Sequence, residues 1–219
     1  MRLTTLSRAE PSIVRTGLRA LAACWLALAA AGATAGEPPK AAAAGWSVFT
    51  NCTLLARAAN DGDSFHVQAN GAEYIFRLYF ADCPETDLQV PARVQEQASY
   101  WGVGRAEALE AGADAKRFAR RALREPFTVQ TRFEDARGQS DRPRYFAFIV
   151  TRAGLLHEQL VACGLARSYG MHQDLPDGTP WRKHVRRLDA MEHQARQKKL
   201  GLWASSEAPA RRRPAAAGP

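Results

Sequence analysis

Residues 46–80 hold three strand-forming runs separated by tight turns, and this pattern restricts the fold more than any other feature of the chain. The runs are rich in β-branched and aromatic residues or alternate polar with apolar side chains. They span residues 46–58, 64–68 and 73–80. The sequence NDGD separates the first two runs, and Asn70-Gly71 between the last two is a typical hairpin signal. The segment is therefore predicted to form a three-stranded antiparallel meander.

The rest of the domain adds two strands and three helices. Periodicity and stop signals place the strands at residues 127–133 and 145–151 and the helices at residues 106–124, 155–163 and 181–199. The order is then β-β-β-α-β-β-α-α, an α+β chain that is mainly β. Five strands with an inserted helix predict a five-stranded Greek-key barrel of the OB-fold type.

Both ends of the chain have a composition unlike that of the domain. Residues 1–35 combine four arginines, an apolar run and the cleavage pattern Ala33-Thr34-Ala35, which predicts a secretory signal peptide. The apolar run is too short for a membrane span. A lipoprotein box ending at Cys24 is the alternative, with a lipid anchor on that cysteine. Residues 36–44 are expected to be a linker, residues 45–204 the folded domain, and residues 205–219 a disordered basic Ala/Pro/Arg tail.

The net charge of the predicted mature chain is positive. Removing residues 1–35 takes four of the 30 basic and one of the 22 acidic residues, which leaves a net charge of +5. A basic secreted domain suits a polyanion such as nucleic acid, although solubility alone would explain the charge as well.

Export permits disulfides. Of the three cysteines that remain, Cys52 and Cys163 are the expected pair, because Cys83 lies inside a motif assigned to chemistry.

Two clusters carry the residue types that phosphodiester hydrolysis requires. The reaction needs water that is aimed and deprotonated, and fixed positive charge around the phosphate. The first cluster is DGDS at residues 61–64, and the second is RLYFADCPET at residues 77–86. Carboxylate oxygens of Asp63 and Asp82 would suit a hard cation such as calcium. Each cluster alone is more often a simple turn or loop.

Taken together, these pieces resemble the thermonuclease, or staphylococcal nuclease-like, family. Further matching segments are RYFAFI at residues 144–149, HEQLVACGLAR at residues 157–167 and KKLGLW at residues 198–203. The resemblance covers about residues 52–204, and the Arg-to-Glu segment is its most specific part. It implies an OB-fold barrel and calcium-dependent cleavage of DNA and RNA, with products ending in a 3′-phosphate.

The resemblance also implies roles for individual residues. Asp63 and Asp82 match the family's calcium-binding carboxylates, and the backbone carbonyl of Cys83 matches a third ligand at a position where threonine is usual. Glu85 matches the glutamate that activates or orients the attacking water. Arg77 matches a phosphate-binding arginine, and a structural ion pair with Asp82 or Glu85 is the alternative.

The second phosphate-binding arginine is less clearly placed. The family has an aromatic-Gly-Arg sequence before the last strand, whereas this chain reads SDRPRYFA at residues 140–147. Counting back from Ala147 selects Arg144, and Arg142 is the alternative. Tyr169 lies where the family stacks an aromatic ring on a base, although it could equally belong to the core. Residues 89–104 form a longer insertion than the family predicts, and no role is assigned to them.

These observations predict a monomeric, calcium-dependent exported nuclease with low sequence specificity whose partners are DNA and RNA. No membrane span is expected in the mature chain. The main alternative is a non-catalytic OB-fold nucleic-acid-binding module of the cell envelope. A second alternative is a structural or conjugation-associated envelope protein that uses the same domain.

Overall fold

Five strands close into a barrel in the computed structural model, which describes residues 45–137 and 142–206. The strands are β1 (Ser47–Leu54), β2 (Ser64–Ala69), β3 (Ala72–Leu78), β5 (Phe127–Asp135) and β6 (Arg144–Thr151). They pair in the order β3-β2-β1-β5-β6. A parallel pairing of β3 with β6 closes the sheet on itself. The predicted fold class, an OB-type barrel of α+β composition, is thereby confirmed.

Three shorter strands, of two residues each, are added to this barrel. β7 (Gly154–Leu155) forms a hairpin with β6. β4 (Ala81–Asp82) and β8 (Arg167–Ser168) make a separate antiparallel pair, in which Asp82 lies opposite Arg167. This small sheet joins the end of the third barrel strand to a segment much later in the chain.

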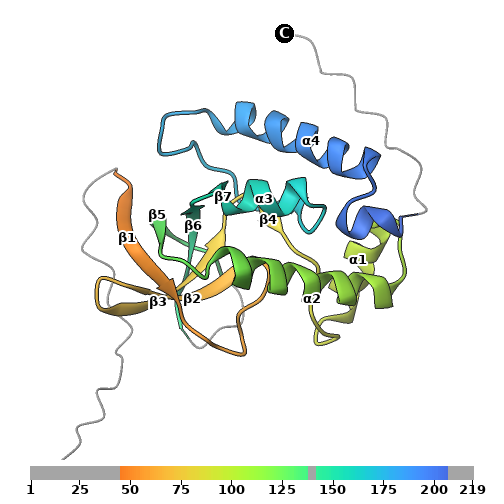
Figure 1. The fold of residues 1–219 in the computed structure, drawn as a ribbon, viewed down its shortest axis with the longest axis horizontal. Coiled ribbons are helices and arrows are strands. Elements are labelled where there is room, and N and C mark those ends of the chain that lie inside the picture. The colour runs from red at the N-terminus through yellow and green to blue at the C-terminus, as the bar shows by residue number, and fades with distance from the viewer. Residues whose placement is uncertain (1–44, 138–141, 207–219) are drawn as a thin grey trace, which may run out of the picture. The chain divides into compact units, whose positions relative to one another are not determined.

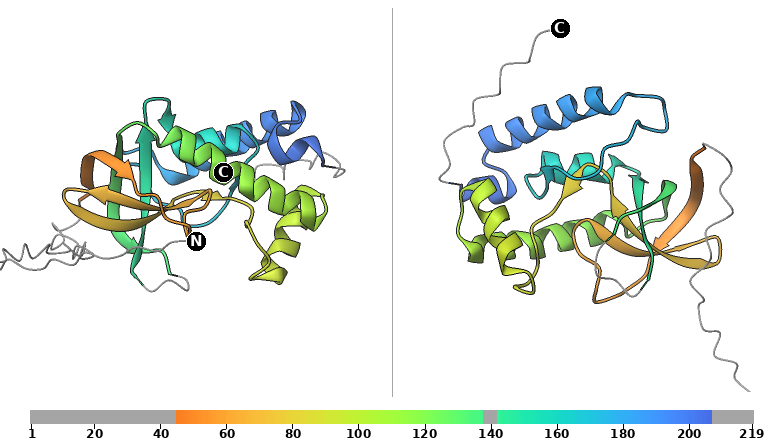
Figure 2. Two further views of the ribbon diagram at one scale, coloured as in Figure 1. Left: turned by 60° about the horizontal axis from the view of Figure 1, so that its bottom comes forward. Right: turned by 180° about the vertical axis from the view of Figure 1, so that it is seen from behind.

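The described residues contain four α-helices rather than the three that were predicted. They are α1 (Pro91–Trp101), α2 (Arg105–Ala122), α3 (Leu156–Ala162) and α4 (Trp181–Gln197), followed by the 3-10 helix η1 (Gly201–Ala204). Helix α3 lies between the barrel strands and α4, as Figure 1 and the right-hand view of Figure 2 show. Helix α1 lies beside the beginning of α2 and η1 (Figure 1).

Helix α1 is the element that the sequence analysis did not foresee. Pro91 stands in its first turn, where a missing N–H costs nothing, and Gly102 ends it in the left-handed conformation at φ 68°. Its inner face buries Val94, Ala98 and Trp101. The indole of Trp101 packs against Trp203 of η1, with ring centroids 6.1 Å apart. The insertion is therefore a packed helix.

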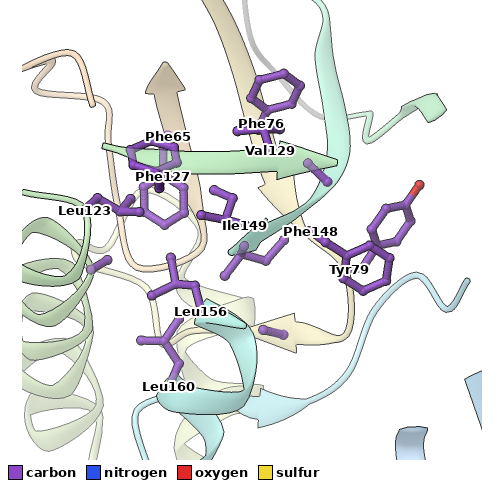
Figure 3. Close-up of a cluster of buried hydrophobic side chains, with 14 of the residues drawn as sticks. Phe65, Phe76, Tyr79, Leu123, Phe127, Val129, Phe148, Ile149, Leu156 and Leu160 are labelled. Carbon is purple, nitrogen blue, oxygen red and sulfur yellow. The ribbon is translucent and has the colours of Figure 1, made fainter. Parts of the chain in front are cut away.

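The core fills the barrel and continues beneath α3. Figure 3 shows side chains from the strands, among them Phe65, Phe127 and Ile149, meeting Leu156 and Leu160 of α3. All five are buried. Burial of this apolar surface, at about 25 cal/mol per Å², is the main force that holds the helix against the barrel. The turn before β2 and the segment after β3 meet at one end of the barrel, which we call the barrel mouth.

The predicted disulfide is wrong, because Cys52, Cys83 and Cys163 all carry free thiols. Cys52 is buried on β1 and its thiol contacts the carbonyl of Phe49 at 3.4 Å.

The predicted signal peptide and linker, and nearly all of the basic tail, lie outside the described residues. Within the described part of the chain, no helix combines the length and hydrophobicity that crossing a membrane requires.

Candidate active site

Strands β2 and β3 bring together the first two predicted site residues. Ser64, the first residue of β2, lies opposite Arg77 of β3, so Asp63 in the turn lies beside the arginine. The Leu78 N–H donates to the Asp63 carbonyl at 2.9 Å. The Arg77 guanidinium lies 3.7 Å from the Asp63 carboxylate and 3.3 Å from that of Asp82. Backbone pairing therefore fixes the positions of Asp63 and Arg77, and Arg77 links Asp63 to Asp82.

The segment after β3 turns sharply and carries the next group of predicted residues, which we call the motif loop (residues 81–85). The turn passes through Phe80, whose φ of 63° is rare for a bulky side chain. The loop then lies directly on α2 at Gly112, where an added Cβ would come within 2.2 Å of the Glu85 carbonyl oxygen. A glycine inside a helix costs stability, but here it is required for this close approach.

The motif loop is fixed from both sides by hydrogen bonds. The Cys83 N–H donates to the Asp63 carboxylate at 3.0 Å. Its carbonyl accepts from the Gln97 side-chain amide at 2.9 Å. The Glu85 N–H donates to the Gln97 side-chain carbonyl at 2.9 Å. These bonds bring four predicted site residues close together, as their matches to the family motif implied: Asp63, Asp82, Cys83 and Glu85.

Helix α1 adds charged side chains that the sequence analysis missed. Arg93 bonds the carboxylates of both Asp82 and Glu85. Glu96, three residues later, forms a two-pronged ion pair with Arg167 at 2.6 and 2.8 Å. The signals that could have revealed the helix were Pro91 at its start and Gly102 at its end, but no sequence signal shows that Arg93 faces the site.

Arg167 is a further functional candidate that the sequence analysis passed over, although it ends one of the family-like segments. It is 1% exposed, and its Nε donates to Asp82 at 2.9 Å. The ring of Tyr169 stacks against the guanidinium, which lies 4.3 Å from the ring centroid. Arg167 therefore joins the carboxylate of the motif loop to the aromatic side chain that was predicted to contact a base.

Three carboxylates concentrate negative charge at the barrel mouth. Asp61 accepts the N–H groups of Asp63 and Ser64 at 3.0 and 2.7 Å, which shapes the turn. Burial, and next the charge of Asp61, raise the pKa of Asp63 to about 7. Asp82 repels it further, while Arg77 lowers its pKa. A positive ion beside Asp63 would relieve this repulsion further, as the charge of Arg77 already does in part.

The atoms that could bind a metal ion here are of the type that calcium prefers. Asp63, Asp82 and the Cys83 carbonyl offer only hard oxygen atoms, and Cys83 N–H bonding to Asp63 places them side by side. The described residues contain no group of three or more His, Cys, Asp or Glu side chains arranged as a metal centre. A calcium ion here would therefore take two carboxylates, one carbonyl and water molecules. Both oxygens of Asp82 also have protein donors, Arg77 and Arg93 on one and Gln97 and Arg167 on the other.

The structure separates the two candidates for the second arginine. Arg144 begins β6 opposite Ile75 of β3, and burial followed by the charge of Arg77 lowers its pKa. Its Nη2 donates to the Arg137 carbonyl, and its buried Nε has no hydrogen-bond partner among the described residues. Arg142 instead lies 3.6 Å from Glu73. Arg144 is thus the candidate that lies near Arg77.

Two pockets flank this cluster. One is lined by both sides of the β5–β6 connection and by the segment after β8, including Arg137, Phe146, Tyr169 and His172. Tyr169 is 54% exposed there, so it is not a core residue. The other, which we call the basic pocket, lies between the β1–β2 connection and α2. Its lining includes Asp61, Lys116, Arg120, Arg121 and Arg124.

A comparison with protein-family models gives a match that agrees with this geometry. Residues 75–205 match the family described as staphylococcal nuclease homologue. The matched range covers more than half of the 219 residues and includes Arg77, the motif loop, α1 and Arg167. Asp63 and the basic pocket's β1–β2 connection precede the matched range.

Proposed function

The chain belongs to the staphylococcal nuclease homologue family, and we propose that it is an exported, calcium-dependent nuclease that hydrolyses DNA and RNA with low sequence specificity. The observation that carries the proposal is the meeting of Asp63, Arg77, Asp82 and Glu85 at the barrel mouth. Family membership supports nuclease chemistry in general. Calcium, export, substrate range and 3′-phosphate products are parts of the proposal.

The residues of this chain have distinct roles in the proposed reaction. Arg77 and Arg144 hold oxygens of the scissile phosphate, because a guanidinium can donate two parallel hydrogen bonds and stays charged. Glu85 accepts the proton of the attacking water; its carboxylate is about one-third exposed, so water reaches it. Asp63, Asp82 and the Cys83 carbonyl would hold calcium. When bound, calcium supplies positive charge that orients the water and offsets charge on the phosphate.

Two further features support a nucleic-acid substrate. Tyr169 offers an exposed aromatic face for a base, and stacking of this kind tolerates any sequence. The basic pocket offers five cationic side chains on the other side of the cluster, those of Arg57, Lys116, Arg120, Arg121 and Arg124. In OB-folds, the loops that flank the barrel mouth commonly bind oligonucleotides. A strand placed across the mouth would therefore meet a base-stacking surface on one side and a phosphate-binding surface on the other.

The proposal is tested by release of acid-soluble nucleotides from single-stranded DNA and from RNA. We expect cleavage with calcium and none with a chelator. Glu85→Gln should lower turnover about 10²- to 10⁴-fold, the usual contribution of a general base. Glu110→Gln is the matched control, because Glu110 is exposed on α2. The mass of the chain recovered outside the cell tests cleavage after Ala35.

A non-catalytic binding module remains the second candidate. The observation that favours it is the complete pairing of Asp82 with protein donors, together with the Arg93 bond to Glu85. In that case single-stranded DNA would bind with the same affinity to wild type and to Glu85→Gln, and neither protein would release nucleotides. Equal cleavage by both proteins would contradict the assigned role of Glu85.

A further inference from the structure

Gln97 of α1 is a buried amide whose hydrogen bonds all reach the motif loop. Its side chain is fully buried. Its carbonyl accepts the Glu85 N–H at 2.9 Å, and its amide donates to the Cys83 carbonyl at 2.9 Å and to Asp82 at 3.2 Å. A buried polar group of this kind is costly unless it is satisfied, and when satisfied it specifies one arrangement of its partners. Here the partners are three functional positions of one loop.

The helix holds Gln97 in place through its neighbours. Arg93 and Glu96 lie four and one residues before it, and both are tied to the site through Asp82, Glu85 and Arg167. Trp101, one turn later, is buried against Trp203. The position of the amide is therefore set by the packing of the whole helix.

The remaining supports of the motif loop do not replace these bonds. Asp63 holds the Cys83 N–H, and Gly112 provides the surface on which the loop lies. Neither bonds the Cys83 carbonyl or the Glu85 N–H. Gln97 alone, among the described contacts, joins the proposed metal-binding carbonyl to the backbone of the proposed general base.

We propose that Gln97 is a positioning residue that holds the Cys83 carbonyl and Glu85 in place relative to Asp63. This inference rests on the proposed function, because it concerns the residues assigned there to calcium and to water. Gln97 touches neither substrate nor reacting atoms in this role. It acts through the loop, where a displacement of about 1 Å can cost about 100-fold in rate.

Substitution by methionine separates this role from simple packing. Gln97→Met keeps a side chain of similar length but removes all three hydrogen bonds. Gln95→Met is the matched control, because Gln95 lies on the exposed face of the same helix and its side chain donates a hydrogen bond to Ser99 rather than to the motif loop. The readouts are kcat and KM on an oligonucleotide, calcium affinity by calorimetry, and hydrogen exchange of the Glu85 amide.

For Gln97→Met we expect a fall in kcat of about 100-fold with KM changed less than about threefold. The Glu85 amide should exchange at least about tenfold faster once its acceptor has been removed. Calcium affinity should fall as well, whereas Gln95→Met should match wild type in every measurement. A folded Gln97→Met protein with wild-type kcat and wild-type Glu85 exchange would overturn the proposal.

A second variant covers the case in which Gln97→Met does not fold. Gln97→Glu keeps an acceptor for the Glu85 N–H but removes both donors and places a carboxylate beside Asp82, so Glu85 exchange should stay near wild type while kcat falls. Unchanged kcat in a folded Gln97→Glu protein would contradict the role assigned to the amide. If wild type cleaves nothing, the nuclease proposal fails, yet amide exchange and calcium titration still decide whether Gln97 positions the loop.

Discussion

The barrel side of the site and helix α1 hold functional side chains by different means. On the barrel side, Asp63 and Arg77 are placed by backbone pairing between β2 and β3. Helix α1 pairs with no strand and reaches the site through side chains, chiefly Arg93 and Gln97. Backbone ladders survive a change of side chain, whereas side-chain bonds do not. Substitutions on the barrel side should therefore remove chemistry and leave the geometry intact, while those on α1 should alter the geometry and the balance of charge.

Among substitutions on the barrel side, the largest loss of activity is expected at Arg77. Arg77→Ala should lower turnover about 10²- to 10³-fold, as removal of one electrostatic stabiliser of the transition state typically does. The free energy of unfolding should fall by about 1 to 3 kcal/mol, because buried Asp63 loses its ion pair while Asp82 keeps Arg93 and Arg167.

Activity assays and urea unfolding check this prediction side by side. Arg152→Ala makes the same change of charge at an exposed position and should leave both quantities unaltered. If Arg77→Ala had little stability as well as little activity, Arg77 would be a structural ion-pair partner, and the contrast between barrel and helix would break down.

An intermediate effect is expected at Arg93 on the α1 side. Its guanidinium bonds Asp82 and Glu85, so it opposes the approach of a second cation to the same carboxylates. Arg93→Gln should bind calcium about tenfold more tightly, which corresponds to about 1.4 kcal/mol. In calcium-free buffer the variant should be less stable, because the loop carboxylates are deprived of a partner.

Calorimetric titration with calcium and unfolding with chelator measure the two sides of this prediction. Arg105→Gln, an exposed arginine at the start of α2, controls for the general reduction of positive charge. Weaker calcium binding by Arg93→Gln would mean that Arg93 supports the ion rather than competing with it.

The smallest effect, on single-stranded DNA binding, is expected at the basic pocket. Substitutions there test whether the substrate runs along the barrel side, away from α1. Replacing Arg120 and Arg121 by alanine should weaken single-stranded DNA binding at every sequence. The slope of log affinity against log salt should become shallower by about 0.7 for each phosphate that the protein no longer binds. The measurement uses Glu85→Gln protein, which leaves the DNA intact.

Lys183 and Arg186 on the exposed face of α4 provide a control pair with the same reduction of charge. Their replacement by alanine should change the slope little, because they lie outside both pockets. Equal slopes for the two double variants would place the substrate elsewhere and remove the basic pocket from the proposed path.

Local sequence features were enough to predict the barrel and most of the motif. Alternating apolar residues and the Asn70-Gly71 turn are local features, and local features suffice to define strands and their hairpins. The order of the family-like segments then led to Arg77, the motif loop and the candidate Arg144. Helix α1 was missed although Pro91 and Gly102 mark its ends, because its inner face carries polar Arg93 and Gln97 where a helix normally shows apolar residues.

Contacts between side chains that are distant in the sequence could not be predicted in this way. The parallel pairing of β3 with β6 places Arg144 near Arg77 and leaves Arg142 beside Glu73. The pairing of β4 with β8 brings Arg167 to Asp82, and the packing of Trp101 brings Gln97 to Glu85. The same packing left Cys52 and Cys163 unpaired. The physical reason is that periodicity records contacts a few residues apart, whereas these contacts depend on how whole elements pack, which no short stretch of sequence encodes.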